Sequence, residues 1–372
     1  LQNNGGSTQT RALLGDSPAV NAGTFSDVPA ADQRGIPRPA EFSGGFVDIG
    51  AYQIPLGENH GPVNHFPSDV LTFVDVPIAF DAQMAARVSI SDFDAGNQPV
   101  SVTLQATNGR LSFPARDGLI ISELGSLNVT DVNVIGSVAD INLALEELTF
   151  RPRAEFVGQA SLAITTNDQG NSGAGGFRFD SDLIRITVRK VLTVNNVADS
   201  VDANPGNGVA ADSSSRATLR AAIMEANAQP GLDRIVLPAN TYRLTRTGAG
   251  EDLAATGDLD ITDDAIIQGA GRDTTVIDAA DLDRVLHIHP GATLTLRDVT
   301  IRGGRVGTGQ LGGGILNSGR LLLENSQVTD NEADRGGGIA NWVPTGTTTG
   351  GFASIVGSLI SANAATTDGG GL

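Results

Sequence analysis

The sequence predicts an all-β protein in which a β-solenoid follows an antiparallel β-sandwich. Three observations support this prediction. Only 4% of the 372 residues are aromatic, and the apolar residues are mainly Val, Leu, Ile and Ala, a composition that suits thin layers of strands. Between residues 87 and 191, apolar and polar residues alternate in strand-length runs. Near the C-terminus, three glycines followed by an aliphatic residue recur after 24 residues, and such a period is typical of a solenoid.

The charge of the chain limits its partners. The sequence has 32 Asp, 10 Glu and a single lysine, Lys190, and its net charge is −18. This charge should repel nucleic acids and anionic membranes, so cations are better partners. Without cysteine the chain has no disulfides, no zinc–thiolate site and no thiol nucleophile. It also lacks an apolar run of 18 residues, so we expect no membrane span.

Composition divides the chain into three segments. Residues 1–57 are rich in Gly, Pro, Ala and Asp, and we expect only short strands there. Residues 58–190 contain about seven short strands, including runs at 99–107, 159–168 and 182–191, which predict an antiparallel β-sandwich. The run 137–148 breaks the alternation and fits a short helical turn.

The third segment, residues 191–372, begins with a helix near 217–228. Asp212 and the three serines after it are candidate N-caps, and Pro230-Gly231 should end the helix. Strand-length runs then follow at short intervals to the C-terminus. We expect the helix to cap the end of the solenoid, where open strand edges would otherwise be exposed.

The 24-residue repeat predicts how the coils stack. Gly312–Gly314 recurs as Gly336–Gly338, and Asn317 recurs as Asn341. Glycines at one corner allow positive φ and close approach of neighbouring coils. Asparagines at one position can bond to one another from coil to coil, so we expect a structural ladder of Asn317 with Asn341 and a second of Asn331 with Asn363. A ligand groove is the alternative interpretation of these rows.

Two stretches resemble secreted bacterial β-helix proteins. Residues 218–245, "TLRAAIMEANAQPGLDRIVLPANTYRLT", resemble the CSLREAD-type N-terminal region, although Ala217 stands where that family has Cys. Residues 1–52 are similar to the choice-of-anchor Q terminal region. The resemblance implies that 191–372 begin a right-handed parallel β-helix of the pectate-lyase-like kind. It also implies that 1–57 form the terminal cap region of a preceding β-helix, and that the chain is a piece of a tandem array.

The middle segment resembles bacterial cadherin-like domains, which have a β-sandwich of Ig-like architecture. Asp92-Phe93-Asp94 matches their DxD motif, Asp168-Gln169-Gly170 their DxG motif, and Glu58 lies where they have an acidic linker. The resemblance implies that Asp92, Asp94, Asp168 and Glu58 bind calcium, which takes six to eight oxygen ligands. The alternative is a solvated turn held by aspartate side chains.

Two other groups of residues suggest chemistry. One is a series of aspartates near Arg272 and Arg284: Asp258, Asp260, Asp263, Asp264, Asp278, Asp281 and Asp283. We expect these aspartates to start turns between strands. The other is the pair His287 and His289, two residues apart as in a metal-binding strand. No third ligand is evident in the sequence, so we expect outward-facing surface histidines.

These features predict a structural or adhesive segment of a large tandem-repeat protein on the bacterial cell surface or outside the cell. We expect it to form fibres, to be stiffened by calcium and to contact neighbouring copies or cell-surface glycans. We expect no enzymatic activity. The alternative is a carbohydrate-binding or polysaccharide-cleaving β-helix protein. That alternative needs acidic residues together with Arg or Lys at matching positions on consecutive coils, and the sequence shows no such set.

Overall fold

The computed structural model describes residues 3–4, 6–13, 19, 22–23, 28–38, 47–53, 59–81, 87–114, 117–122, 129–170, 173–343 and 350–372. These residues form 28 strands and two short helices, so the predicted all-β class is confirmed. The chain divides into two compact units, Leu1–Arg189 and Lys190–Leu372. No helix in the described part of the chain is long and apolar enough to cross a membrane.

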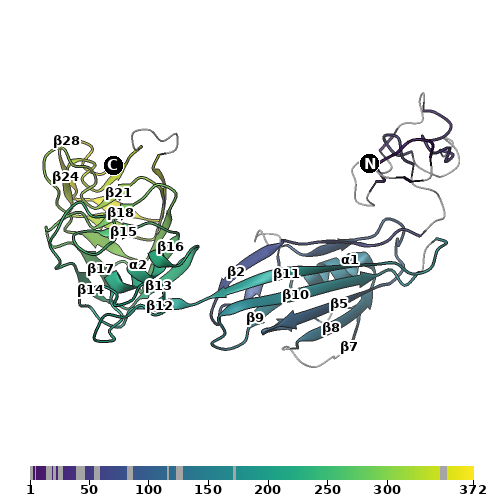
Figure 1. The fold of residues 1–372 in the computed structure, drawn as a ribbon, viewed down its shortest axis with the longest axis horizontal. Coiled ribbons are helices and arrows are strands. Elements are labelled where there is room, and N and C mark those ends of the chain that lie inside the picture. Colours follow the sequence, from purple (N-terminus) through teal and green to yellow (C-terminus); the bar gives the residue numbers. More distant parts are fainter. Residues whose placement is uncertain are drawn as a thin grey trace. The chain divides into compact units, whose positions relative to one another are not determined.

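The first unit is built mainly from antiparallel sheets. Its strands are β1 (Val63–His65), β2 (Asp69–Phe73), β3 (Ile78–Ala79), β4 (Ser89–Ser91), β5 (Val100–Thr107), β6 (Gly109–Ser112), β7 (Ile120–Ser122), β8 (Asp131–Gly136), β9 (Thr149–Pro152), β10 (Gly158–Asn167) and β11 (Phe179–Arg189). The largest sheet has the order β2-β11-β10-β5-β8-β7 (Figure 1). The second sheet has the order β3-β9-β6, and β1 pairs with β4. The expectation of antiparallel pairing is wrong for one pair, since β2 and β11 run parallel.

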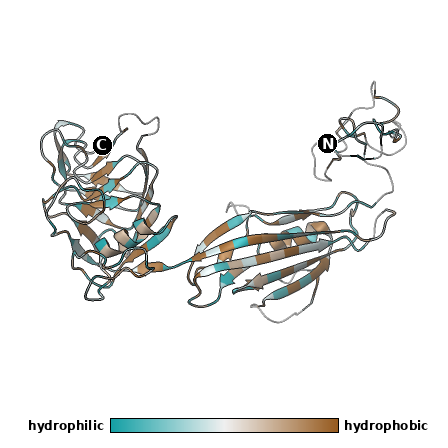
Figure 2. Cartoon of the chain, viewed as in Figure 1, coloured by the Kyte–Doolittle hydropathy of each residue, from teal (hydrophilic) through white to brown (hydrophobic). Residues whose placement is uncertain are grey.

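One hydrophobic core joins the two larger sheets of this unit. Val102 and Leu104 of β5, Leu111 of β6 and Phe150 of β9 are all buried in it. Hydrophobic and hydrophilic residues alternate along the strands of the six-stranded sheet (Figure 2), as strands with one buried face require.

Helix α1 (Val138–Leu145) adds Ile141 and Leu145 to this core. Its N-cap is Ser137, whose side chain accepts a hydrogen bond from the N–H of Asp140. The helical turn predicted within 137–148 is therefore a short α-helix.

The described parts of residues 1–57 contain no regular strand, and an isolated bridge joins Ala31 and Pro37. A polar network holds them together. Asp32 forms an ion pair of 2.7 Å with Arg34, whose guanidinium lies 3.5 Å from the centre of the Tyr52 ring. The N–H of Gln53 donates to Asp32 at 2.8 Å, so the network joins segments 31–38 and 47–53.

The second unit contains the remaining strands. They are β12 (Val191–Thr193), β13 (Asp233–Leu237), β14 (Asn240–Arg243), β15 (Leu259–Ile261), β16 (Ala265–Gly269), β17 (Thr275–Asp278), β18 (Leu286–Ile288), β19 (Thr293–Arg297), β20 (Thr300–Arg302), β21 (Ile315–Asn317), β22 (Arg320–Glu324), β23 (Gln327–Thr329), β24 (Glu332–Arg335), β25 (Ile339–Asn341), β26 (Phe352–Val356), β27 (Leu359–Ser361) and β28 (Ala364–Asp368). They form sheets with the orders β12-β13-β16-β19-β22-β26, β14-β17-β20-β23-β27, β15-β18-β21-β25 and β24-β28.

The chain visits three of these sheets in turn, so that β13, β14 and β15 are followed by β16, β17 and β18 in the same sheets. Every strand pair of this unit is parallel, including all pairs between residues 290 and 340. Leu, Ile and Val residues from successive strands fill one core along the stack. The predicted parallel stacking is present in the described coils.

Helix α2 (Leu219–Ala228) begins two residues later than predicted. Thr218 is its N-cap and accepts a hydrogen bond from the N–H of Ala221. The N-caps expected between residues 212 and 215 were wrong, because Asp212 instead bonds the N–H groups of Ser214 and Arg216 in a separate turn. Leu219 and Ile223 of the helix pack in the core of the stack.

The glycine triplets lie where neighbouring coils approach most closely. A Cβ atom on Gly313 would lie 2.4 Å from the carbonyl oxygen of Glu332 and 2.6 Å from that of Gly337. Gly312 and Gly336 have φ of +68° and +59°. The repeated motif therefore provides both the left-handed turn and the space for backbone-to-backbone contact.

Candidate functional site

The two predicted asparagine pairs are hydrogen-bonded side chain to side chain. Asn317 Nδ2 donates to Asn341 Oδ1 at 2.8 Å, and Asn331 Nδ2 donates to Asn363 Oδ1 at 2.9 Å. The first pair is separated by 24 residues and the second by 32, so the coils differ in length. Asn317 and Asn331 are buried, which supports the ladder rather than the ligand groove.

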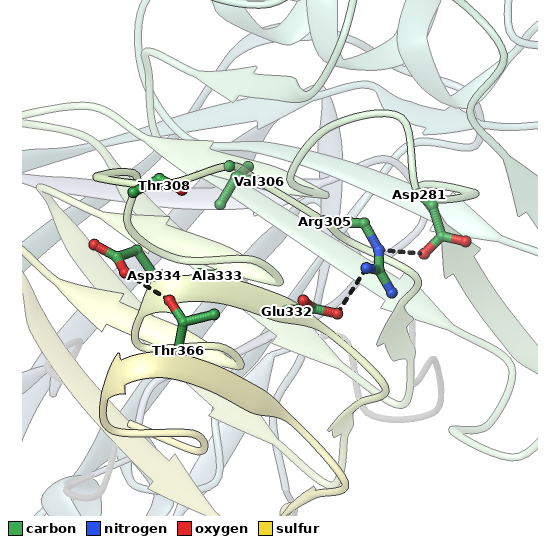
Figure 3. Close-up of a pocket in the computed structure, with 9 residues that line it drawn as sticks. Asp281, Arg305, Val306, Thr308, Glu332, Ala333, Asp334 and Thr366 are labelled. Carbon is green, nitrogen blue, oxygen red and sulfur yellow. Dashed lines mark hydrogen bonds and ion pairs between the residues drawn. The ribbon is translucent and has the colours of Figure 1, made fainter.

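A pocket opens on the surface of consecutive coils (Figure 3). Its volume is about 370 Å³, and charged side chains line it from three coils: Asp281, Arg305, Glu332 and Asp334. Arg305 and Glu332 face one another across a parallel bridge. This is the set of acidic residues and arginine that the sequence did not reveal. It was missed because a strict 24-residue period does not align Arg305 with Glu332.

The charges in this pocket are already paired. Arg305 lies between two carboxylates, with Nη1 2.8 Å from Glu332 Oε2 and Nε 3.5 Å from Asp281 Oδ1 (Figure 3). Asp334 Oδ1 accepts hydrogen bonds from the hydroxyls of Thr366 and Thr367, both at 2.6 Å. These bonds lower the pKa of Asp334. A carboxyl with a lowered pKa is a poor general acid.

Three of the sequence-predicted aspartates are buried and lie close together. Asp258 is 3% exposed, and Asp260 and Asp283 are also buried. Burial raises the pKa of Asp258 to about 7, with further contributions from the charges of Asp260 and Asp283. Arg284 opposes this effect, with Nη1 3.4 Å from Asp258 Oδ2. These three aspartates are therefore buried, a feature that the expectation of turn-starting residues did not include.

Three other aspartates of the series accept hydrogen bonds from backbone N–H groups, and Asp278 does so within a local turn. Asp278 Oδ1 accepts from the N–H of Ala280, and Asp264 Oδ1 accepts from the N–H of Thr293. Asp263 Oδ2 accepts from the N–H of Gly231. Arg272 does not join the buried aspartates, and its guanidinium donates instead to the carbonyl of Gly357.

The structure brings two of the predicted calcium ligands together. Burial raises the pKa of Asp92 to about 6, and the adjacent carboxyl of Asp94 adds to the effect. Asp92 Oδ1 accepts from the N–H groups of Asp94 and Ala95, while Asp92 Oδ2 is buried without a hydrogen-bond partner among the described residues. A cation would compensate such a group, which is costly to bury alone.

Asp168 lies in a different turn. Its Oδ1 accepts hydrogen bonds from the N–H groups of Gly170 and Arg178, at 2.9 and 2.7 Å. Asn59 contacts the same segment by donating from its side chain to the carbonyl of Gly176. The Oδ1 atom of Asn59 is buried and has no hydrogen-bond partner within the described part of the chain. This oxygen is a candidate calcium ligand that the sequence did not reveal. Glu58 lies outside the described residues.

The histidine pair lies beside further candidate ligands that were not evident in the sequence. His289 Nε2 lies 3.0 Å from Asp260 Oδ1, and His287 Nδ1 lies 3.5 Å from the same oxygen. Asp252 Oδ1 lies 3.9 Å from the same His289 Nε2. The sequence therefore holds a third and a fourth candidate ligand, which the coil register brings next to the histidines. Across the described residues, this is the one group of at least three His, Asp or Glu side chains whose ligand atoms all lie within 4.8 Å of one another.

Neither a protein-family model nor a curated protein sequence matches this chain.

Proposed function

We propose that this chain is a structural or adhesive segment of a bacterial tandem-repeat protein that acts at the cell surface or outside the cell. Its second unit is the start of a right-handed parallel β-helix, and residues 58–190 are a cadherin-like β-sandwich. The described parts of 1–57 belong to the terminal cap of a preceding β-helix. Neighbouring copies of the repeat and cell-surface glycans are the proposed partners.

The observation that carries this proposal is the order in which the chain visits its parallel sheets. Each passage through the three sheets adds one strand to each of them, and one aliphatic core runs through the stack. Every added coil extends the paired backbone by roughly 4.8 Å along the stack. A stack of this kind provides an elongated, rigid surface.

Calcium is the proposed cofactor of the first unit. Asp92 and Asp94 bring two carboxyl groups together, and the buried oxygen atoms of Asp92 and Asn59 point to an oxygen-rich environment. Asp168 and Glu58 are the further ligands that the cadherin-like resemblance implies. Calcium accepts this donor type from several chain segments.

The charged groups of the second unit argue against catalysis. Cleavage of a polysaccharide needs a proton donor and a base that both reach the sugar. Asp258, whose pKa is raised, is buried, while the accessible pocket contains the hydrogen-bonded carboxylate of Asp334 and the paired guanidinium of Arg305. The residue suited to donate a proton, Asp258, is therefore not the one that a sugar could reach in the pocket.

The test is a screen of neutral and acidic polysaccharides for reducing ends or unsaturated products. We expect no turnover by the full chain. The Asp258→Asn and Asp334→Asn variants provide the decisive comparison. Turnover that disappears in either variant, while circular dichroism shows the fold to be intact, would make the chain an enzyme and overturn the proposal.

The pocket at Arg305 favours glycan binding as a second candidate function. It combines a guanidinium, three carboxylates and two threonine hydroxyls on one surface, and such groups can hydrogen-bond sugar hydroxyls. A glycan array probed with the full chain should give signals that Arg305→Ala abolishes. Arg297→Ala is the matched control, because Arg297 also pairs with a carboxylate, Glu324 at 2.5 Å, but is not among the residues that line the pocket.

A further inference from the structure

Two neighbouring coils place histidine and aspartate side chains on one side of a parallel sheet. Strands β15 and β18 pair in register, with Asp260 opposite His287. The residues on either side of each are buried in the core, so the alternation of a strand directs Asp260 and His287 to the other face. His289 follows the end of β18, and its ring lies beside that of His287.

The distances between these side chains match those of a metal site. Asp260 Oδ1 is 3.0 Å from His289 Nε2 and 3.5 Å from His287 Nδ1, and Asp252 Oδ1 is 3.9 Å from His289 Nε2. The ligand atoms all lie within 4.8 Å of one another. Two atoms that bind one tetrahedral zinc ion at about 2.1 Å lie roughly 3.4 Å apart. The side chain of Asp252 is 72% exposed, so it can rotate to close the remaining gap.

The hydrogen bonds around Asp260 orient its carboxylate towards the histidines. The N–H of Ala254 donates to Asp260 Oδ2 at 3.0 Å, which leaves Oδ1 facing the two imidazoles. Asp260 is 0% exposed. Burial would raise its pKa, but the hydrogen bonds from His287, His289 and Ala254 together lower it. Metal ligands are commonly fixed by such outer bonds.

The two imidazoles compete for a single oxygen atom. Their ring centres are only 3.9 Å apart, so two protonated rings would repel one another strongly. A cation between the rings and the carboxylates would use the ring nitrogens as ligands and remove this competition. Two imidazole nitrogens with two carboxylate oxygens form a donor set of the zinc type, whereas calcium and magnesium prefer oxygen ligands alone.

We propose that Asp252, Asp260, His287 and His289 bind a divalent transition-metal cation of the zinc type. The cation joins three segments: the loop at residues 251–256, strand β15 and the end of strand β18. Arg220 of α2 already holds the inner side of this loop, because its buried guanidinium donates to the carbonyls of Ala254, Gly257 and Asp258. The metal would bind the same loop through Asp252 and would thereby connect it to Asp260 and the two histidines.

The experiment uses the full chain, stripped of metal with a chelator and then titrated with Zn²⁺ by calorimetry and with Co²⁺ by visible absorption. We expect one saturable site, with the intense d–d bands of tetrahedral cobalt. The chain has four histidines. The His287→Ala/His289→Ala double variant should bind at least about 100-fold more weakly, whereas the His60→Ala/His65→Ala double variant is the matched control and should bind as the parent does.

Asp252→Asn tests the fourth ligand without disturbing a buried group, and it should weaken binding by about 10-fold or more. Calcium at the same concentrations should not compete. The proposal is wrong if zinc binds no better than calcium, or if the control variant loses affinity while the His287→Ala/His289→Ala variant keeps it. Neither outcome depends on whether the chain binds glycans or cleaves polysaccharides.

Discussion

At the scale of single residues, buried asparagines satisfy backbone groups that the turns of the stack leave open. Asn331 Oδ1 accepts from the N–H of Gly304 at 2.9 Å, and Nδ2 donates to the carbonyl of Thr329 at 2.9 Å as well as to Asn363. An amide side chain can form these bonds at once because it carries both donors and acceptors. Polar residues in this core are thus part of its packing.

Replacing Asn331 with Ala should destabilise the stack by about 2–4 kcal/mol, since more than one buried backbone group then lacks a partner. Urea unfolding, followed by circular dichroism, measures the change. Asn363→Ala is the comparison, because Asn363 lies on the last described coil and is only half-buried. If Asn363→Ala lowers the free energy of unfolding as much as Asn331→Ala does, the burial of Asn331 is not the source of the stability.

Asp32 ties the N-terminal segment together through its charge. Burial acts to raise its pKa, but hydrogen bonds from the N–H of Gln53, the Arg34 side chain and the N–H groups of Arg34 and Ile36 outweigh it, so the pKa is lowered. An acid with a lowered pKa in the folded state stabilises the fold above its unfolded pKa of 3.8. This stability is lost as the pH falls below that value.

We therefore predict that the Gln53 amide loses protection from hydrogen exchange below about pH 4, after correction for the intrinsic exchange rate. Asp32→Asn should show the low protection at neutral pH as well. Equal protection in Asp32→Asn and the parent chain at pH 7 would mean that the carboxylate does not hold segments 31–38 and 47–53 together.

At the scale of elements, glycine sets how closely two coils approach. Gly313→Ala would place a methyl group against two carbonyl oxygens of the next coil, so we expect a loss of about 1–3 kcal/mol or more. Gly307→Ala is the matched control, because a Cβ there meets no atom within 4 Å. It should be neutral or stabilising by up to about 1 kcal/mol. Thermal unfolding of both variants measures the change in stability. An equal change in Gly313→Ala and Gly307→Ala would contradict the close-contact role of Gly313.

Sequence patterns predicted those elements whose signal is local. The alternating runs at 99–107, 159–168 and 182–191 correspond to β5, β10 and β11, because one buried face imposes a period of two. The first residue of α2 was less predictable, since several Ser and Asp residues near it are equally good caps. Thr218 fulfils that role because Asp212 and its neighbours form their own turn.

The sites across coils could not be read from the sequence because the coils differ in length. A constant period of 24 residues would place Asp263 opposite His287, whereas the observed register places Asp260 there. Arg305 and Glu332 were missed for the same reason. The buried Arg220, paired with Asp199 at 2.5 Å, gave no sequence signal either, because arginine on a helix is usually exposed.

At the scale of the whole molecule, we propose different cations for the two units. Calcium should stabilise the first unit, since the carboxylates of Asp92 and Asp94 repel each other without it. At about 10 mM calcium, and with a Kd of roughly 0.1–1 mM as in extracellular modules, the gain is about 1.4–2.7 kcal/mol. The melting temperature of the full chain should therefore fall after chelation.

Asp94→Ala should abolish this response to chelation, and Asp131→Ala should keep it because Asp131 lies on the exposed part of β8. Zinc added to the chelated protein should not restore the melting temperature of the first unit. If chelation leaves the melting temperature of the parent chain unchanged, Asp92 and Asp94 only form a turn.

The proposed structural role depends on the parallel register in which the second unit stacks its coils. Because the chain has no cysteine, Leu316→Cys with Ala340→Cys can be introduced into adjacent strands at paired positions. Neighbouring strands are about 4.8 Å apart, within the Cα separation that a disulfide spans. In Leu316→Cys with Trp342→Cys, a shift of two residues gives roughly 8 Å, beyond that reach. We predict that mild oxidation yields an intramolecular disulfide in the first pair only, detected by mass spectrometry. Efficient cross-linking of the shifted pair, with none in the paired positions, would contradict the stacked register.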